Sequence, residues 1–334
     1  MEPVQTSRLT TLHRLAQPNS GPDIVTRRPL HRRVRASGRE GFIIVAVLWI
    51  LVALATLASI YSIYVNNSAL AVTAMDERLQ AEALVPASLN LTAYRLAVPK
   101  DVQRPTRGQF GFRLGQANVA VNYSSEAARI DLNAASKELL TGFFAALGAS
   151  RDDASRYADR VIGWREAPKR SDQADEAALY RSAGLPYGPR GAAFAHIDEL
   201  WLVQGLPPGL VRRALPLATV YSGLPDINVF DAPPELIAAL PGMTSLRAAD
   251  FLNRRDAASR DKDSLSRLLG PDQVGATTEG SNAFRVRTNI TFQSGWRTAS
   301  EAVILLDSSD EPYQVLSWRS DVDADQPQVA ARSR

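Results

Sequence analysis

The sequence predicts an α+β protein in which a long N-terminal helix packs on an antiparallel sheet that is interrupted by a large all-helical insert. Three observations predict this arrangement. An uninterrupted apolar run of 24 residues, Phe42 to Val65, is followed by two short stretches in which apolar and polar residues alternate. Ala-rich amphipathic runs broken by Pro and Gly occupy residues 133–280. Alternation returns from Phe284, so the strands flank the helical segment on both sides.

Composition excludes several kinds of chemistry. The 334 residues include no cysteine and only three histidines, which rules out disulfide scaffolds, thiolate metal sites and multi-histidine zinc sites. The net charge of +3 is uneven, because residues 1–41 hold eight arginines against three acidic residues. The remainder has 30 of the 38 basic residues and 32 of the 35 acidic ones. That near-neutral balance gives no electrostatic footprint for a polyanion, so we expect no nucleic-acid partner.

The apolar run predicts a membrane span. No charged residue occurs from Gly41 to Met75, and Phe42–Val65 can cross about 30 Å of hydrocarbon at 1.5 Å per residue. A buried core helix is the alternative, although one of this length is rare. A secretory signal cleaved near Ala69–Ala71 is another, but its apolar region would be shorter. The arginines before the span place the N-terminus in the cytoplasm and the rest of the chain outside.

The expected elements beyond the span follow from periodicity. The helix continues past Met75 toward Leu96, with Pro86 expected to kink it or end a hydrogen-bonded turn. Two alternating stretches form a hairpin that turns near Gly115. Strands are expected at 109–114, 118–123, 284–292, 299–306 and 313–318, and helices of the insert at 136–147, 151–165, 197–204, 208–214, 233–240 and 246–255.

The insert contains a weak internal repeat. Residues 130–140 (IDLNAASKELL) resemble residues 227–237 (INVFDAPPELI), each with an extended start, a capping region and a helix. The second copy continues through Pro241-Gly242 and looks like a helix-hairpin-helix, which often holds DNA phosphates through backbone amides. Arginines follow in the second helix, but neighbouring aspartates and the acidic balance oppose DNA binding. We favour a structural packing unit.

The start of the apolar run resembles a type IV prepilin signal. The basic leader ends in Arg39-Glu40-Gly41, and Phe42 opens the helix at once. The resemblance implies that a dedicated peptidase cuts between Gly41 and Phe42 on the cytoplasmic side. Most members of the class have glutamate at the fifth mature position, which is Ala46 here. A carboxylate in the bilayer is costly without a cation partner, and in pilins the neighbouring subunit's N-terminal amine is that partner. The absence of this glutamate suits a subunit at the filament tip.

Further blocks extend the resemblance to general secretion pathway protein K, the K-type minor pseudopilin of type II secretion, which as a rule lacks this glutamate. These blocks are residues 196–203 (HIDELWLV), 220–223 (VYSG), 227–243 (INVFDAPPELIAALPGM) and 312–319 (PYQVLSWR). The resemblance implies a pilin-like fold whose insert is SAM-like or helix-hairpin-helix-like. The expected parts are a cleaved leader (1–41), the transmembrane part of the helix (42–65), an α+β domain (66–132 and 281–320), the helical insert (133–280) and a flexible tail (321–334).

The resemblance also implies a function. The protein would cap the pseudopilus tip, together with I- and J-type minor pseudopilins and the major pseudopilin, after processing by the prepilin peptidase. It would be a single-pass inner-membrane protein with a periplasmic C-terminal domain. The alternative is a membrane-tethered DNA-uptake protein built on the helix-hairpin-helix. We expect no enzyme, because no P-loop, G-x-G-x-x-G, H-E-x-x-H or G-x-S-x-G occurs and no motif ties His196 to a nucleophile.

One acidic segment is a candidate metal site. Asp172, Asp175 and Glu176 could supply oxygen ligands for calcium. The family resemblance points to the same place, since relatives carry calcium in a loop between two acidic stretches. In this sequence Arg165 stands where an acidic ligand is expected, and two more cations follow. A calcium site at these three residues is therefore set against a solvated acidic loop.

Overall fold

The computed structural model describes residues 40–97, 104–167, 173–271, 273–306, 311–320 and 322, with the backbone alone at 40–41 and 173–175. The chain divides into two units, Met1–Ser68 and Ala69–Arg334. Helix α1 (Glu40–Leu96) has residues in both units. Most of the predicted leader and nearly all of the predicted tail lie outside the described residues. The domain boundaries drawn from the sequence remain a prediction.

The part of α1 in the first unit is apolar and exposed. Every side chain from Phe42 to Ser68 is exposed, except that of Ala46, which is half-buried. Among the described residues, α1 is the one helix that is long and apolar enough to cross a membrane, by length and composition. In the second unit α1 continues through Pro86, whose carbonyl accepts a hydrogen bond from Asn90 Nδ2 at 2.9 Å, and it ends at Leu96.

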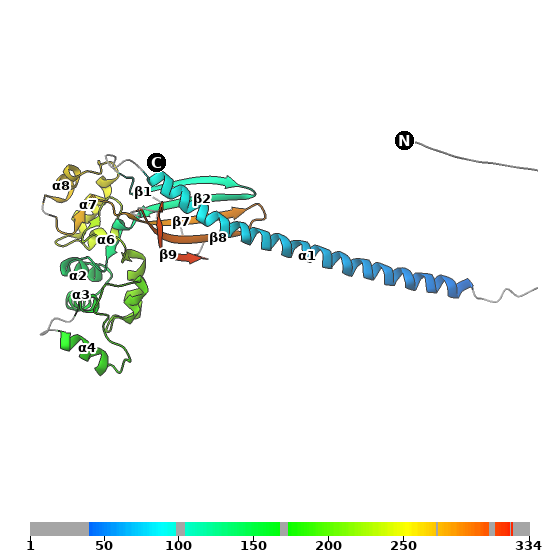
Figure 1. Cartoon of the computed structure of the whole chain (residues 1–334), viewed down its shortest axis with the longest axis horizontal. Helices are drawn as coiled ribbons and strands as arrows, with labels where there is room; N and C mark the ends of the chain where they lie inside the picture. The colour runs from blue at the N-terminus through cyan, green and yellow to red at the C-terminus, as the bar shows by residue number, and fades with distance from the viewer. Residues whose placement is uncertain are drawn as a thin grey trace, which may run out of the picture. The chain divides into compact units, whose positions relative to one another are not determined.

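The second unit is built on a five-stranded antiparallel sheet in the order β1-β2-β7-β8-β9 (Figure 1). The β1–β2 hairpin turns at Gly115, whose φ of 59° suits glycine, as the sequence predicted. Strands β2 and β7 are hydrogen-bonded neighbours although the whole helical insert separates them in sequence. The strands are β1 (Arg107–Leu114), β2 (Ala117–Ser125), β7 (Ala283–Phe292), β8 (Arg297–Leu305) and β9 (Gln314–Ser320).

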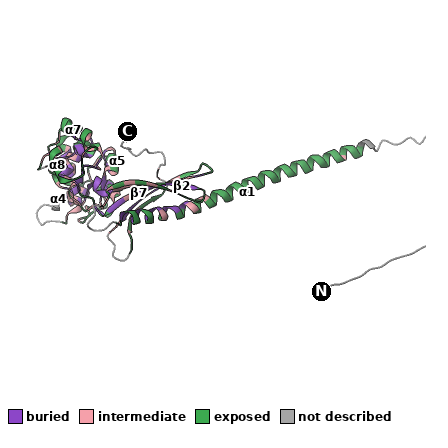
Figure 2. Ribbon diagram, turned by 90° about the horizontal axis from the view of Figure 1, so that it is seen from above, coloured by how far each residue is buried: buried purple, intermediate pink, exposed green. Residues whose placement is uncertain are grey.

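The second half of α1 covers one face of this sheet. Buried apolar residues follow the helical period along one face of α1, as the purple patches on α1 show (Figure 2). They share a core with inward-facing residues of β2, β7 and β8, and the Ser88 and Thr288 hydroxyls are 2.5 Å apart within it. The helix residues of this core are Ala81, Leu84, Val85, Leu89 and Leu96.

The insert has a separate apolar core. Aromatic side chains fill it, among them Phe143, Trp164 and Phe251. Its α-helices are α2 (Lys137–Ala146), α3 (Arg151–Arg165), α4 (Gln173–Ser182), α5 (Pro208–Ala214), α6 (Pro234–Ala238), α7 (Ser245–Arg255) and α8 (Lys262–Leu269). The 3₁₀ segments of the described residues are η1 (Glu126–Ala128), which precedes the insert, and η2 (Ile197–Leu202) and η3 (Leu215–Leu217) within it.

Sequence reasoning erred at three of these elements. Helices α4 and α8 were not predicted, and the helix expected at 197–204 is the 3₁₀ segment η2. The solvated acidic loop proposed for residues 171–176 is wrong from Gln173 onward, because α4 begins there and Glu176 is buried. Burial of Glu176 is tolerated because Arg160 of α3 forms an ion pair with it.

The internal repeat is present in three dimensions. Each copy opens with a two-residue strand that pairs in parallel with an Ala-Thr strand at its end: β3 (Ile130–Asp131) with β4 (Ala218–Thr219), and β5 (Ile227–Asn228) with β6 (Ala276–Thr277). In each copy, the side chain of the second residue of the opening strand accepts a hydrogen bond from the backbone N–H two positions on. The acceptor is Asp131 Oδ1 at 2.8 Å in the first copy and Asn228 Oδ1 at 3.1 Å in the second. The two copies thus share both the parallel strand pair and the side-chain hydrogen bond that follows the opening strand.

An arginine at the end of the second helix of each copy completes this likeness. Arg165, the last residue of α3, donates to the carbonyls of Leu132 and Ala135 at 2.6 and 2.9 Å. Arg255, the last residue of α7, donates to the equivalent carbonyls of Val229 and Ala232 at 3.2 and 2.6 Å. These carbonyls belong to the turns that lead into α2 and α6. Each arginine therefore joins the end of the second helix to the turn before the first helix of its own copy, a contact called here the arginine clamp.

A buried ion pair joins the sheet to the insert. The carboxylate of Glu126, fully buried in η1, accepts from Arg285 of β7 at 2.8 and 3.0 Å and from Arg129 at 3.2 Å. The Thr219 hydroxyl of β4 also donates to it. Burial alone would raise the pKa of Glu126, but the charges of Arg285 and Arg129 and these hydrogen bonds bring it below its ordinary value. Arg285 also pairs with Glu301 of β8 at 2.7 Å.

Glu126→Gln is expected to lower the free energy of unfolding of the second unit by about 3–5 kcal/mol, because it leaves the buried Arg285 short of a counter-charge. The matched control is Glu82→Gln, since Glu82 forms an exposed pair with Arg78 that contributes about 0–1 kcal/mol. Urea unfolding followed by tryptophan fluorescence measures both. Because the pKa of Glu126 is lowered on folding, its contribution is present above the unfolded pKa and lost as the pH falls through the folded one. Equal effects of the two substitutions would contradict this role.

Arg165→Met and Arg255→Met are each expected to destabilise the insert by about 1–3 kcal/mol, because the buried carbonyls they bind lose a charged donor. Arg181→Met, at an exposed position in the last turn of α4, serves as the control and should change stability by about 0.5 kcal/mol or less. Denaturation midpoints of the three variants decide the matter. If the Arg165 and Arg255 variants unfold at the same denaturant concentration as the control, the arginine clamps do not contribute to the stability of the insert.

Candidate functional site

The N-terminal end of α1 holds the predicted processing residues. The helix begins at Glu40, so Gly41 and Phe42 lie in its first turn, and the Phe42 side chain is 77% exposed. Ala46 follows one turn later and is half-buried. The structure therefore places these three residues together at one helix end. Their roles in cleavage and tip placement remain predictions.

Two hydroxyl groups within the apolar part of α1 are hydrogen-bonded inside the helix. The hydroxyl of Thr56 donates to the Val52 carbonyl, and that of Ser59 donates to the Ala55 carbonyl at 2.9 Å. No carboxylate occurs between Glu40 and Asp76. This stretch can therefore enter hydrocarbon without an unpaired charge, and the Thr56 and Ser59 hydroxyls need no partner outside the helix.

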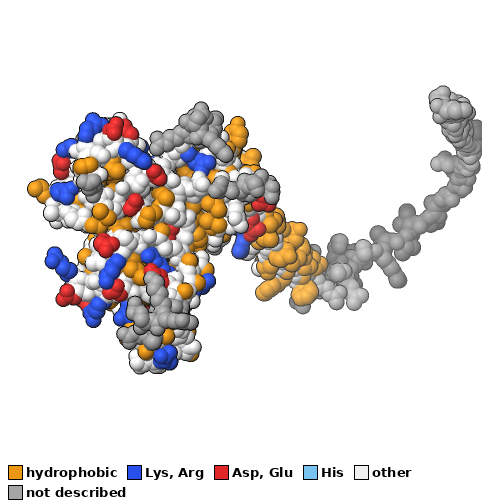
Figure 3. Space-filling model, turned by 60° about the vertical axis from the view of Figure 1, so that its left-hand side comes forward, with side chains coloured by type: hydrophobic (Ala, Val, Ile, Leu, Met, Phe, Trp, Pro, Cys, Tyr) orange, Lys and Arg blue, Asp and Glu red, His pale blue; other side chains and the backbone are white. Residues whose placement is uncertain are grey.

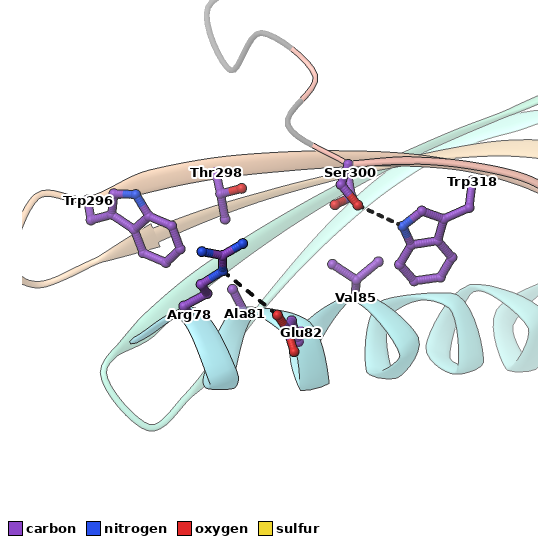
Figure 4. A pocket seen from close by; sticks show the side chains of 9 residues that line it. Arg78, Ala81, Glu82, Val85, Trp296, Thr298, Ser300 and Trp318 are labelled. Carbon is purple, nitrogen blue, oxygen red and sulfur yellow. Dashed lines mark hydrogen bonds and ion pairs between the residues drawn. The ribbon is translucent and has the colours of Figure 1, made fainter. Parts of the chain in front are cut away.

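A groove opens between the second half of α1 and the β8–β9 edge of the sheet (Figure 4). It encloses about 600 Å³. Trp296 and Trp318 flank it on the sheet side and are 38% and 43% exposed, while Val85 of α1 lies across from them. Trp296 stacks on Phe292 with ring centroids 5.2 Å apart. The remaining lining residues are Arg78, Ala81, Glu82, Thr298, Ser300 and Ser320.

Sequence reasoning missed this groove, because its two walls are more than 200 residues apart in the chain. Both tryptophans are partly exposed, which is typical of surfaces that contact other proteins. The charges at its rim are already paired, since Arg78 and Glu82 are 3.9 Å apart on successive turns of α1. The only sequence signal was the pair of tryptophans near strand ends.

The candidate calcium residues are only partly described. Asp172 lies outside the described residues, and so does the side chain of Asp175, whose backbone is in α4. Glu176 is buried and pairs with Arg160, which places a cation where a calcium site needs a free ligand. No group of three or more His, Asp or Glu side chains that could hold a metal occurs among the described residues. The calcium site remains a prediction, and Glu176 fits it poorly.

The arginines of the helix-hairpin-helix are engaged within the protein. Arg247 donates to the Leu269 carbonyl at 2.9 Å and to the Gly242 carbonyl of the hairpin at 3.3 Å. Arg254 pairs with Asp250 at 3.1 Å, and Arg255 forms the clamp described above. On the face seen in Figure 3, basic and acidic side chains alternate over the insert and form no basic stripe. This arrangement supports a packing unit over a DNA-binding one.

His196 caps a helix. Its Nδ1 accepts a hydrogen bond from the backbone N–H of Asp198 at 3.2 Å at the start of η2, and no nucleophile is among its described hydrogen-bond partners. The neighbouring Glu199 carboxylate binds Trp164 Nε1 at 3.1 Å and Arg190 at 2.8 Å. The HIDELWLV block is therefore a structural segment of the insert.

Comparisons with known proteins agree with this fold. Residues 117–223, about a third of the chain, match the family described as type II secretion system (T2SS), protein K. A chain of the crystal structure of the GspK–GspI–GspJ complex from the type 2 secretion system of enterotoxigenic Escherichia coli is similar, with a TM-score of 0.55 and 21% identity over 74% of this chain and 98% of that chain. No curated protein matches the sequence. The predicted pilin-like α+β fold is confirmed.

Proposed function

We propose that this chain, whose residues 117–223 belong to the family of type II secretion system protein K, is a minor pseudopilin that caps the tip of the pseudopilus. The observation that carries the proposal is helix α1. Residues 42–65 are apolar, free of carboxylates and exposed except for Ala46, and the second part of the helix is a structural element of a pilin-like domain. A helix that anchors in the membrane and also builds the folded domain is what a filament subunit needs.

The prepilin peptidase would release the mature protein by cutting between Gly41 and Phe42. The exposed apolar part of α1 would then hold the protein in the inner membrane as a single-pass subunit, with the domain beyond Ala69 in the periplasm. The eight arginines before the span support this orientation by the positive-inside rule.

Placement at the tip rests on two features. Ala46 cannot pair with the N-terminal amine of a subunit above it, whereas a glutamate at that position could. The insert adds a second domain with its own core to the pilin-like unit, and its bulk would hinder another subunit from stacking above.

The partners would be I- and J-type minor pseudopilins and the major pseudopilin. The similar solved chain comes from a complex of GspK with GspI and GspJ, which supports this choice. Beyond the span, α1 keeps a set of exposed apolar side chains suited to lateral packing against other helices. They are Leu70, Val72, Met75 and Leu79.

Processing provides the first test. Co-expression with a prepilin peptidase is expected to give a mature protein that begins at Phe42, measured by mass spectrometry of the intact chain. Gly41→Ala should abolish this product by placing a methyl group at the cleaved bond. The control is Gly38→Ala, which leaves that bond unchanged. A start after Ala71, or a start at Phe42 without the peptidase, would refute entry into the pilin pathway.

Tip placement provides the second test. Ala46→Glu is expected to weaken co-purification with the partner pseudopilins, and secretion, about five-fold or more, because a tip subunit has no amine above it to neutralise the new carboxylate. Ala46→Gln introduces a side chain of the same size as glutamate but without its charge, and it should reduce co-purification and secretion much less. Normal assembly of the Ala46→Glu protein would mean that a cation partner is present, which is incompatible with the tip.

A further inference from the structure

A second, smaller pocket lies where the start of β1 meets the insert. It encloses about 180 Å³, room for about six waters at their liquid volume of about 30 Å³ each. Arg104 lines it from the segment that leads into β1, and Arg260 lines it from the segment before α8. No carboxylate is among its described lining residues, the rest of which are Pro105, Thr106, Asn228 and Thr278.

Neighbouring groups hold both guanidinium groups in place. Arg104 Nε donates to the Leu96 carbonyl at 3.0 Å, and its Nη1 donates to Asn282 Oδ1 at 2.8 Å. Arg260 Nη1 donates to Asp231 Oδ1 at 2.6 Å. A guanidinium carries five N–H donors, so each group keeps further donors beyond these bonds. Two guanidinium groups that line the same small pocket are a pair of donors that suits an oxyanion.

The charge around the pocket is unbalanced. The Asp231 carboxylate, only 2% exposed, has Arg260 and Arg107 as ion-pair partners at 2.6 and 3.2 Å. Arg255 lies close by, and its buried Nε has no hydrogen-bond partner among the described residues. Burial lowers the pKa of Arg255, and the charges of Arg107 and Arg260 lower it further against the opposing effects of Asp231 and Asp256. Three arginines thus lie around one buried carboxylate, and Arg104 is a further arginine among the residues that line the pocket.

Nearby acids do not remove this excess. Asp256 lies 3.9 Å from Arg255 and is exposed, and Glu279 pairs with Lys262 at 3.3 Å. Burial raises the pKa of the Asp226 carboxyl, and the charge of Glu279 raises it further. An anion in the pocket would supply the missing counter-charge.

We propose that this pocket binds a small tetrahedral oxyanion, with the size and charge of inorganic phosphate, between Arg104 and Arg260. Phosphate oxygens accept the parallel N–H donors of a guanidinium in a bidentate manner. Arg104 belongs to the sheet side of the domain and Arg260 to the insert, so the bound anion would bridge the two and strengthen their junction. The proposal is independent of the secretion role, which could fail while this site remains.

The test is isothermal titration of the purified full chain in detergent micelles with inorganic phosphate, against sodium chloride of equal ionic strength. Saturable binding with a Kd below about 1 mM is expected, accompanied by a rise in Tm. Arg104→Gln and Arg260→Gln should each weaken binding about ten-fold or more. Arg113→Gln, an exposed position on the same strand as Arg107, should bind like the parent.

A third substitution covers the case in which the glutamine variants unfold. Arg104→Lys keeps the charge and loses the planar fork, so binding should weaken while the fold persists. Competition by glycerol 3-phosphate would show that the phosphoryl group of an organic ligand can fill the site, and its failure would restrict the site to the free anion. Heat that does not saturate, or equal losses in the Arg104, Arg260 and Arg113 variants, would mean non-specific ion binding and overturn the proposal.

Discussion

The architecture depends on one buried ion pair. Glu126 stands where the chain leaves the sheet for the insert, and Arg285 stands where it has just returned. A carboxylate with no exposed surface is tolerable only if it is paired and hydrogen-bonded, and its partners come from both sides: Arg285 from the sheet, Thr219 from the insert. The insert therefore cannot swing free without exposing or orphaning this charge. Arg285 also pairs with Glu301 of β8, so the ion-pair network reaches a further strand of the sheet. We therefore expect the sheet and the insert to unfold together.

Elements with a strong apolar period could be predicted from sequence, and elements defined by local capping or by distant contacts could not. Helix α3 was predicted with its observed bounds, because its buried residues follow the helical period. Helix α8 has only eight residues and is capped by Asp261, whose side chain accepts from the Ser264 N–H at 2.7 Å, so its main sequence signal is that cap and not a long apolar period. Glu176 was assigned to a loop because acidic residues dominate its neighbourhood. Its ion-pair partner Arg160 lies in a different helix, and local sequence gives no sign of that contact.

The internal repeat shows the same division between features that could be predicted from the sequence and features that depend on distant contacts. The likeness of the opening strands and first helices could be read in the sequence, because the residues align without gaps. The equivalence of Arg165 and Arg255 could not, since one lies 35 residues after Ile130 and the other 28 residues after Ile227. Only the shared hydrogen bonds to turn carbonyls identify them. The groove and the oxyanion pocket belong to the same class, because residues far apart in the chain form their walls.

The absence of a carboxylate from the first part of α1 has consequences for assembly. In a subunit that has another subunit above it, a glutamate at the position of Ala46 would draw the helix to that neighbour through a charge pair in a medium of low dielectric, where such a pair is strong. In the proposed tip subunit, Ala46 would remove that attraction and also the cost of a buried charge without a partner. Specific contacts must then come from the folded domain, since lipid tails compete with other helices for apolar side chains. The exposed apolar side chains of α1 beyond the span and the tryptophans of the groove are where that domain offers contact area.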